Sequence, residues 1–392
     1  MDYTFSKAVE ALKPSAIREI LKYASVPGMI SFAAGNPAPE AFPVEAISGI
    51  MNSIMAERPI EALQYNITEG YTPLRDHLKT YMAQKHDSFK SGDELIITSG
   101  AQQVMALAAQ ALCDTGDTVI CEEPSFIGSL NAFRAQGLSL CGVPLDADGM
   151  DIARLENALK TQKNVRFIYV IPTFQNPSGV TTSLAKRKEI YRLASKYNVL
   201  ILEDNPYSDL RFAGEHVPTI KSMDTEGRVI YAGSFSKVLS PGIRVGFAIA
   251  PAPVLAKMVV CKQVADVHTT ILCQMAAHRF MTEQDYESHL SFLANLYGKK
   301  ASLMLTHMKN ELSSDITYNP PEGGLFVWCS LPGGANMPEF CKSAVQQNVA
   351  VVPGNAFLMN ENTPCRHFRM NYSTPTDEQI EKGIAVLGKV PF

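Results

Sequence analysis

Short apolar runs alternate with amphipathic stretches of helix length through the middle of the chain, from about residue 93 to residue 251. The runs read ELIIT, TVICE, VRFIYVIP, VLILED, RVIYAGS and RVGFAIA, and the helix-length stretches between them include 102–112, 125–136 and 184–197. Runs without polar alternation are typical of strands buried on both faces, and strands that alternate with helices favour a mainly parallel sheet. Because ligands of such sheets bind at the carboxyl ends of the strands, we expect the functional residues in the loops that follow these runs.

The pattern changes on both sides of this region. After Pro251 it becomes mostly helical, with a heptad-like stretch over 284–312, and it then returns to the short strands GGLFVWCSL, VAVVP and HFRMNYS. Before about residue 45, the segment PGMISFAAGNPAPEAFP is rich in Pro and Gly, which is typical of an arm laid over other structure. We therefore predict an N-terminal arm with part of the small domain over 1–45, a large ligand-binding domain over 46–285 and a small C-terminal domain over 286–392.

The composition narrows the class of ligand. A chain of 392 residues, 46% of them hydrophobic, is long enough to bury one large core and a second smaller one. The formal net charge of -4 and the scattered Lys and Arg argue against nucleic acid or an anionic membrane as a partner. No apolar leader follows a basic stretch, and no run of about 18 apolar residues occurs, so we expect a cytoplasmic protein with small-molecule ligands. The cysteines occur singly and the histidines form no H-E-x-x-H pattern, which predicts reduced, buried thiols and no metal site.

The loop SFSKVLSPGIRVG, residues 234–246, follows one of the predicted strands and carries a lysine between hydroxyls. Lys237 lies in an otherwise uncharged run of small residues, where desolvation would lower its pKa and make it nucleophilic. Read alone, such a lysine is more often a surface residue. Its neighbours Ser234, Ser236 and Arg244 favour a functional role, because hydroxyls and a forked cation are what a phosphate dianion binds.

A second phosphate-binding feature follows the run ELIIT. The segment Ser99-Gly100-Ala101-Gln102 leads from a strand into a helix, so backbone N–H groups and the positive end of the helix dipole face the carboxyl edge of the sheet. The alternative is an ordinary strand-to-helix turn capped by Ser99.

Two further loops carry groups suited to a charged aromatic ring. In VLILEDNPY, Asp204 ends a buried strand, where a carboxylate is costly unless it pairs with a cation such as a protonated pyridine nitrogen; an arginine is the alternative partner. Glu203 has the opposite phase along the strand and is predicted to be structural, in a helix-capping role. In FIYVIPTFQNPSG, Asn176 lies in a turn, and its amide is suited to bond a phenolate oxygen, with Tyr207 as a second donor. The alternative for Asn176 is the turn alone.

The sequence resembles the class I/II aminotransferases of the aspartate aminotransferase fold, which are pyridoxal-5'-phosphate (PLP) enzymes of fold type I. The motifs that carry this resemblance span nearly the whole chain: SAIREI, SFAAGNPAPEAFP, LQYNITEGYTPLR, ITSGAQQ, EEPSF, QNPSG, EDNPY, SFSKVLSPGIRVG, PEGGLFVW and FRMNYS. The subgroup that it is most similar to contains the 2-aminoadipate and kynurenine aminotransferases and the aminotransferase-like half of MocR regulators. The resemblance implies a large PLP-binding domain built on a mainly parallel, seven-stranded sheet with helices on both faces, and a smaller α+β domain.

The resemblance also implies a role for each matching residue. Lys237 would carry the cofactor and move a proton at the substrate α-carbon, Asp204 would hold the pyridine nitrogen protonated, and Asn176 and Tyr207 would bond the ring oxygen. Phe126 matches a ring-stacking position where Tyr or Trp is common. The residues expected to hold the phosphate are Ser99, Gly100, Ala101, Gln102, Ser234, Ser236 and Arg244, with Tyr65 reaching it from a second subunit.

Substrate contacts follow from the same resemblance. Arg369 matches the arginine that forks onto the substrate α-carboxylate, with Asn176 and Gly35 assisting. Arg18 matches an arm residue that meets the far end of the substrate, and a helix-surface arginine is the alternative. Asn36 stands where a leucine is common, which changes the side-chain pocket.

These inferences predict a homodimeric aminotransferase with shared active sites. It would work by ping-pong half-reactions, with 2-oxoglutarate and glutamate as one pair and 2-aminoadipate or an aromatic or aliphatic amino acid in the other. Two alternatives remain open at this point: a lyase or decarboxylase of the same fold, and a non-catalytic effector-binding module like the MocR half.

Overall fold

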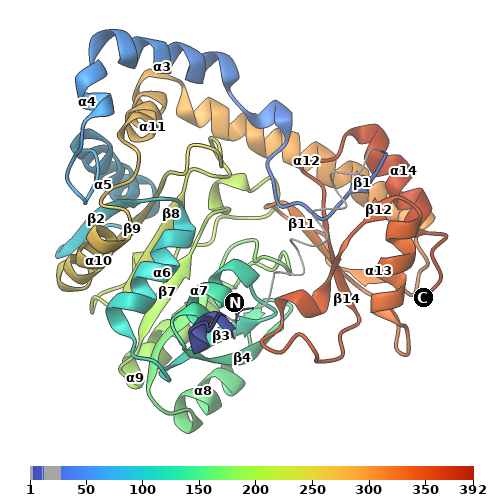
Figure 1. The fold of residues 1–392 in the computed structure, drawn as a ribbon. Helices are drawn as coiled ribbons and strands as arrows, with labels where there is room; N and C mark the ends of the chain where they lie inside the picture. The colour runs from blue at the N-terminus through green and yellow to red at the C-terminus, as the bar shows by residue number, and fades with distance from the viewer. Residues whose placement is uncertain (1–2, 11, 13–27) are drawn as a thin grey trace.

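The computed structural model describes residues 3–10, 12 and 28–392, and it contains two main sheets with helices packed around them (Figure 1). The strand order of the larger sheet is β2-β9-β8-β7-β6-β3-β4-β5. Its strands are β2 (Asp93–Thr98), β3 (Thr118–Glu123), β4 (Ser139–Asp146), β5 (Gly149–Met150), β6 (Val165–Val170), β7 (Leu200–Asp204), β8 (Val229–Ser234) and β9 (Gly246–Pro251). In this sheet β9 runs antiparallel to both β2 and β8, the two-residue β5 runs antiparallel to β4, and the other pairs are parallel. The mainly parallel sheet is confirmed, and β5 adds a short eighth strand to the seven expected.

The continuous apolar runs form strands because both faces of this sheet are covered. Ile201 packs into one buried cluster, whereas its neighbour Leu202 packs into the cluster on the opposite face. The helices that precede, cover or follow the sheet are α3 (Val44–Glu57), α4 (Pro59–Leu63), α5 (Thr72–His86), α6 (Ala101–Leu112), α7 (Ile127–Ala135), α8 (Ile152–Thr161), α9 (Leu184–Lys196), α10 (Ala252–Ala265) and α11 (Ile271–Glu283).

A long helix, α12 (Tyr286–Glu311), leads from this part of the molecule to a second, smaller sheet (Figure 1). That sheet has the order β10-β11-β14-β13 and is antiparallel. Its strands and helices are β10 (Thr317–Tyr318), β11 (Phe326–Ser330), β13 (Val352–Pro353), β14 (His367–Asn371), α13 (Met337–Gln346) and α14 (Asp377–Leu387). The position of α12 agrees with the change of pattern in the sequence, and the domain limits themselves stay a prediction.

The N-terminal segment contacts both parts of the molecule. Helix α1 (Lys7–Glu10) packs near α7 of the larger part (Figure 1). Strand β1 (Ile30–Ser31), which precedes the short helix η1 (Pro39–Ala41), pairs in parallel with β12 (Val349–Ala350) on the smaller sheet's side. The backbone N–H of Asn371 donates to the carbonyl of Phe32 over 2.8 Å. These bonds bring the segment that leads to Gly35 next to β12 and β14.

The sequence analysis did not predict strand β4. Its sequence SLCGVPLD contains a glycine and a proline, which are both unfavourable inside a strand. Pro144 is accommodated because β4 pairs with β3 over 139–144, and with β5 only at its last two residues. The strand therefore lies near the edge of the sheet, where its half-buried side chains show no clear apolar run.

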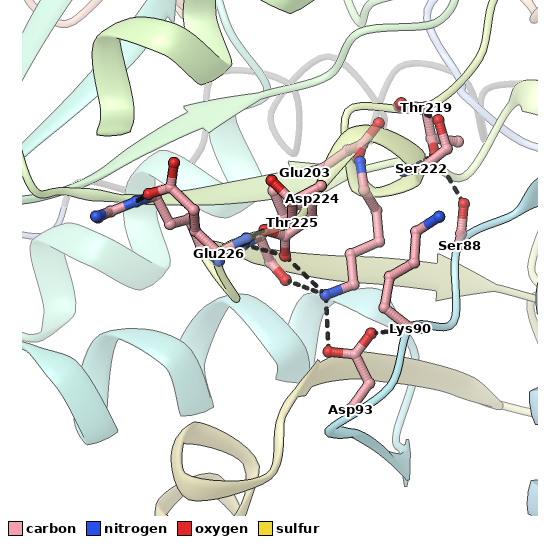
Figure 2. Close-up of polar contacts among 12 residues, drawn as sticks. Ser88, Lys90, Asp93, Glu203, Thr219, Ser222, Asp224, Thr225 and Glu226 are labelled. Carbon is pink, nitrogen blue, oxygen red and sulfur yellow. Dashed lines mark hydrogen bonds and ion pairs between the residues drawn. The ribbon is translucent and has the colours of Figure 1, made fainter. Parts of the chain in front are cut away.

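Glu203 has the helix-capping role that its phase in the strand predicts. Its carboxylate accepts hydrogen bonds from the backbone N–H groups of Ile220, at 2.9 Å, and Lys221, at 2.7 Å, where the short helix η3 (Lys221–Met223) begins. The fully buried ammonium of Lys221 lies 2.8 Å from Asp93 and 3.0 Å from Asp224. Figure 2 labels both of these carboxylates together with Glu203. Removal of one partner from such a buried ion pair costs about 3–5 kcal/mol, so this contact ties the start of β2 to η3.

Two other expectations concern membrane-spanning helices and the cysteines. None of the helices in the described part of the chain is long and apolar enough to cross a membrane. All eight cysteines are free thiols; three are buried and five are half-buried, so their burial is less complete than predicted.

Candidate active site

A cavity of about 400 Å³ lies at the carboxyl ends of the strands of the larger sheet, where strand topology predicts a ligand. Its walls come from the loops after β6, β7 and β8, the start of α6, strand β14 and the segment around Gly35. Twelve residues predicted from the sequence line it: Gly35, Ala101, Gln102, Phe126, Asn176, Asp204, Tyr207, Ser234, Ser236, Lys237, Arg244 and Arg369. The structure therefore brings together groups that are more than 300 positions apart in the chain.

Lys237 projects its amine into this cavity. The Nζ atom donates to the carbonyl of Gly35 over 2.8 Å. Burial, together with the positive charges of Arg369 and Arg244, lowers the pKa of Lys237 to about 8. A substantial part of this amine is therefore neutral near physiological pH, which is the form that attacks an aldehyde.

The expected phosphate end lies where α6 begins. Gly100 has φ +78°, a left-handed conformation, and a Cβ there would collide with the guanidinium of Arg244. That guanidinium donates to the carbonyl of Ser99 over 3.1 Å. A Cβ on Gly246 would lie 2.7 Å from the backbone nitrogen of Ala101, so strand β9 packs directly against this loop. Two glycines thus allow the N–H groups at the start of α6 and the arginine to come together.

Ser99 and Gly100 are not among the residues that line the cavity. The Ser99 hydroxyl instead donates to Asp266 over 2.8 Å. Within the described residues, this hydroxyl therefore anchors the loop to the end of α10. On the other side of the phosphate end, the Ser234 hydroxyl accepts from the backbone N–H of Ser236 over 3.1 Å.

Asp204 ends β7 and is buried at the floor of the cavity. Its Oδ2 atom accepts from the hydroxyl of Tyr169 over 2.8 Å, whereas its Oδ1 atom has no hydrogen-bond partner among the described residues. Burial raises the pKa of this carboxyl to about 7. A buried carboxylate oxygen without a partner needs a cation, and the protonated pyridine nitrogen of PLP is such a cation, so the residues present fit this cofactor.

Arg369, from β14, forms the opposite wall. Its Nη1 donates to Asn176 Oδ1 and its Nη2 to the carbonyl of Ala33, both over 2.7 Å, while its Nε has no partner among the described residues. The guanidinium lies over the Phe326 ring, 4.2 Å from its centroid. Burial lowers the pKa of Arg369 to about 10, so the group is still a cation at neutral pH. A buried, forked cation with a free donor can bind a carboxylate.

Tyr207 and Asn176 lie next to this arginine. The Tyr207 ring stands edge-on to Phe326, with 6.0 Å between centroids. Because the side-chain oxygen of Asn176 accepts the hydrogen bond from Arg369, its amide nitrogen is left to donate. Both residues line the cavity, and their bonds to a ring oxygen stay a prediction.

Tyr65 and Arg18 are two further predicted residues that are not among those lining the cavity. Tyr65 is 80% exposed, and its ring stands edge-on to His268 with 5.8 Å between centroids. Arg18 lies outside the described residues.

Sequence reasoning also missed several residues of the site. Met105, Ser129, Ile171, Pro206 and Phe326 line the cavity, and Tyr169 lies behind Asp204. A signal for Tyr169 exists, because a phenol inside the otherwise apolar run VRFIYV needs a buried hydrogen-bond partner.

Comparison with known proteins agrees with this geometry. The model of the family "Aminotransferase class I and II" matches residues 27–387. The chain belongs to this family. It is 37% identical to aromatic-amino-acid aminotransferase 1 of Thermococcus litoralis, over 99% of this chain and 94% of that protein, and 39% identical to the 2-aminoadipate transaminase of Thermus thermophilus, over 98% and 96%. The crystal structure of an alpha-aminoadipate aminotransferase from Thermus thermophilus, complexed with N-(5'-phosphopyridoxyl)-L-leucine, superposes with a TM-score of 0.90 at 37% identity, covering 98% of this chain and 96% of that one.

The protein is therefore an aminotransferase of fold type I with PLP as its cofactor, as the resemblance implied. Amino acids and 2-oxo acids are the substrates of such an enzyme.

Proposed function

We propose that the enzyme transfers the amino group of 2-aminoadipate, or of an aromatic or aliphatic L-amino acid, to 2-oxoglutarate by a ping-pong mechanism. The observation that carries the proposal is the arrangement of three charged groups around one cavity. Part of the Lys237 amine is neutral near pH 7, and one carboxylate oxygen of Asp204 has no partner among the described residues. Arg369 presents a buried guanidinium. A single cavity that holds these groups suits two half-reactions in which donor and acceptor bind in turn.

Each residue has a distinct proposed task. When bound, PLP supplies an aldehyde that condenses with amines and a ring that draws electrons from the substrate α-carbon. Lys237 binds the cofactor and then moves a proton at the α-carbon of the substrate. Arg369 orients the substrate by its α-carboxylate, and Asn176 and Gly35 assist it. The remaining predicted residues hold the cofactor: Asp204 and Tyr207 at the ring, Phe126 on its face, and the start of α6 with Ser234, Ser236 and Arg244 at the phosphate.

The substrate range rests on two supports. The relatives reported above carry the names of an aromatic-amino-acid and a 2-aminoadipate aminotransferase, and one solved relative holds a leucine adduct of the cofactor. In this chain, Asn36 is an exposed residue on the cavity wall, so a polar side chain can meet the incoming substrate. Arg18 is proposed as the cation for substrates with a second carboxylate.

A homodimer is proposed as the working form. Ile60, Leu63 and Tyr65 are 75%, 69% and 80% exposed, and Val264 at the end of α10 is 88% exposed. The edge-on contact of Tyr65 with His268 places these two apolar stretches near each other. An exposed apolar patch of this kind is typical of a protein interface, and a second subunit would bring Tyr65 to the neighbouring phosphate site. A cytoplasmic location is proposed from the sequence alone.

A donor and acceptor panel tests the proposal. Purified enzyme would be mixed with 2-aminoadipate, phenylalanine, leucine and glutamate in turn, and conversion of the bound cofactor to its amine form would be followed by absorbance. The amine form would then be mixed with 2-oxoglutarate or pyruvate. Conversion by each donor and return with 2-oxoglutarate are expected. If carbon dioxide or ammonia were released without return by any oxo acid, the transfer reaction would be excluded.

A further inference from the structure

Tyr169 lies directly behind the carboxylate that faces the proposed ring nitrogen. On paired strands β6 and β7, Tyr169 is opposite Leu202. Asp204 follows Leu202 by two residues, and side chains two apart on a strand share a face. The Tyr169 hydroxyl therefore reaches Asp204 Oδ2, 2.8 Å away, and it also lies 2.8 Å from the hydroxyl of Ser129 on α7.

The direction of these two hydrogen bonds follows from proton counting. A phenol has one proton, and an ionised carboxylate can only accept. Burial raises the pKa of Tyr169 well above its ordinary value, so the phenol keeps its proton. Tyr169 therefore donates to Asp204 whenever that carboxyl is ionised, and it accepts from the hydroxyl of Ser129.

The phenol is held in this position by its packing. Tyr169 is fully buried, and its ring stands edge-on to Phe133 with 5.3 Å between centroids. Ser129 is also buried and is fixed on the same helix as Phe133. The donor to Asp204 is thus preorganised and does not depend on a bound ligand.

The consequence for Asp204 is twofold. With Oδ2 already bonded, Oδ1 is the atom left for a partner in the cavity. A hydrogen bond donated to a carboxylate stabilises its charge and opposes the effect of burial. A proton shared between this carboxyl and a pyridine nitrogen stays on the nitrogen only while the carboxylate remains ionised.

We propose that Tyr169, oriented by Ser129, is a positioning residue that keeps Asp204 ionised and aims its Oδ1 at the cofactor ring nitrogen. This inference rests on the role proposed above for Asp204. Ser129 and Tyr169 would act on the ring nitrogen through the carboxylate of Asp204.

The test uses PLP labelled with ¹⁵N in its ring and bound to the purified enzyme. The ¹⁵N chemical shift reports whether the ring nitrogen carries a proton. Tyr169→Phe keeps the ring and its packing but removes the donor, so the signal is expected to move from the protonated towards the neutral position. The kcat of the donor half-reaction should fall about ten- to a hundredfold, the range for a hydrogen bond to a charged group, while KM changes little because Arg369 is untouched.

Two further variants keep the test independent of folding defects. Ser129→Ala should move the signal in the same direction by less, because it removes only the group that orients the phenol. Tyr191→Phe removes a different tyrosine hydroxyl that also bonds a carboxylate, 3.2 Å from Asp224. Tyr191 lies on α9 and does not line the cavity, so its variant should leave both the ¹⁵N shift and kcat unchanged.

Asp204→Asn separates the inference from the function on which it rests. If Asp204→Asn loses the ring proton while Tyr169→Phe and Ser129→Ala keep the wild-type shift, Tyr169 is not the positioning residue and the role of Asp204 stands. If Asp204→Asn keeps the ring proton, the proposed role of Asp204 fails and the inference fails with it. A fall in kcat with an unmoved ¹⁵N signal would assign Tyr169 a structural role only, and would overturn the proposal.

Discussion

Arg369 donates a hydrogen bond of 2.7 Å to the side-chain oxygen of Asn176, and this bond joins β14 of the smaller sheet to the loop after β6 of the larger one. It fixes the Asn176 amide with its nitrogen available to donate. It also gives the buried guanidinium a neutral partner, so the cation is only partly compensated. In the proposed function, a substrate carboxylate would supply the missing negative charge.

Arg369→Lys should raise the KM of every amino acid donor by about ten- to a hundredfold, because a lysine is a single point charge and cannot form the fork. Half-reaction kinetics with a neutral and an acidic donor would measure this change. Arg366→Lys is the matched control, since Arg366 is exposed and lies only three residues away. A KM that rises for one donor class alone would argue against recognition of the common α-carboxylate.

Borohydride treatment of the yellow holoenzyme should link the cofactor to Lys237, as peptide mapping would show. Lys221 is an internal control, because its ammonium is fully buried between two carboxylates. The rate at which cofactor-free enzyme binds PLP should rise from pH 7 to 9 and level off above, since the amine with a pKa of about 8 attacks in its neutral form. A label on any other lysine would refute the site.

Asp204→Asn should retain PLP but lose transamination by several orders of magnitude, because an amide cannot hold a proton on the pyridine nitrogen. The cofactor-free variant should at the same time be more stable than the cofactor-free wild type at pH 8, by about 1–3 kcal/mol, since it lacks a buried, partly unpaired charge.

The size of this stability difference depends on pH. The carboxyl has a folded pKa of about 7, raised from 3.8, so the folded wild type loses stability as pH rises towards and through 7. Urea unfolding of both cofactor-free proteins should therefore give equal free energies near pH 4 and a gap at pH 8. If the difference between the two free energies of unfolding were the same at both pH values, the Asn substitution would act through packing.

Tyr65 should act across the subunit interface. Lys237→Ala and Tyr65→Phe chains, each impaired alone, should form a heterodimer that regains one competent site, because only one of its two sites combines Lys237 with the partner's phenol. Tagged co-purification would isolate the heterodimer, and its activity would be compared with both homodimers. No recovery in a verified heterodimer would contradict the shared site.

Arg18→Ala should raise the KM for glutamate, 2-aminoadipate and 2-oxoglutarate by about ten- to a hundredfold, the range for a charge-assisted bond. Aromatic and aliphatic donors should change much less in the amino-acid half-reaction, because they offer no second carboxylate. Equal losses for both classes would assign Arg18 to the structure of the arm.

The residues that could be predicted are those whose chemistry is unusual for their place in the chain. Asp204 at the end of a buried strand and Lys237 among small uncharged residues both stand out in this way, and strand topology then gives their common edge. Phe326 does not stand out, because an aromatic residue in an apolar run is normally core, and the phenol of Tyr169 signals a buried hydrogen-bond partner without indicating which one. Their roles depend on which strands pair, and neither run by itself determines the register of β6 on β7. Ser99 is the opposite case, a predicted residue that does not line the cavity. Its hydroxyl bonds Asp266 instead, and that bond depends on where a distant helix ends.

The bond between the Lys237 amine and the Gly35 carbonyl would make the N-terminal segment a reporter of cofactor loading if Lys237 carries PLP, as proposed. A lysine nitrogen bonded to PLP would no longer offer that carbonyl the same donor, so one tether of the segment over 28–42 would be released. Hydrogen exchange or limited proteolysis of this segment would distinguish loaded from empty enzyme in a mixture, with no substrate added.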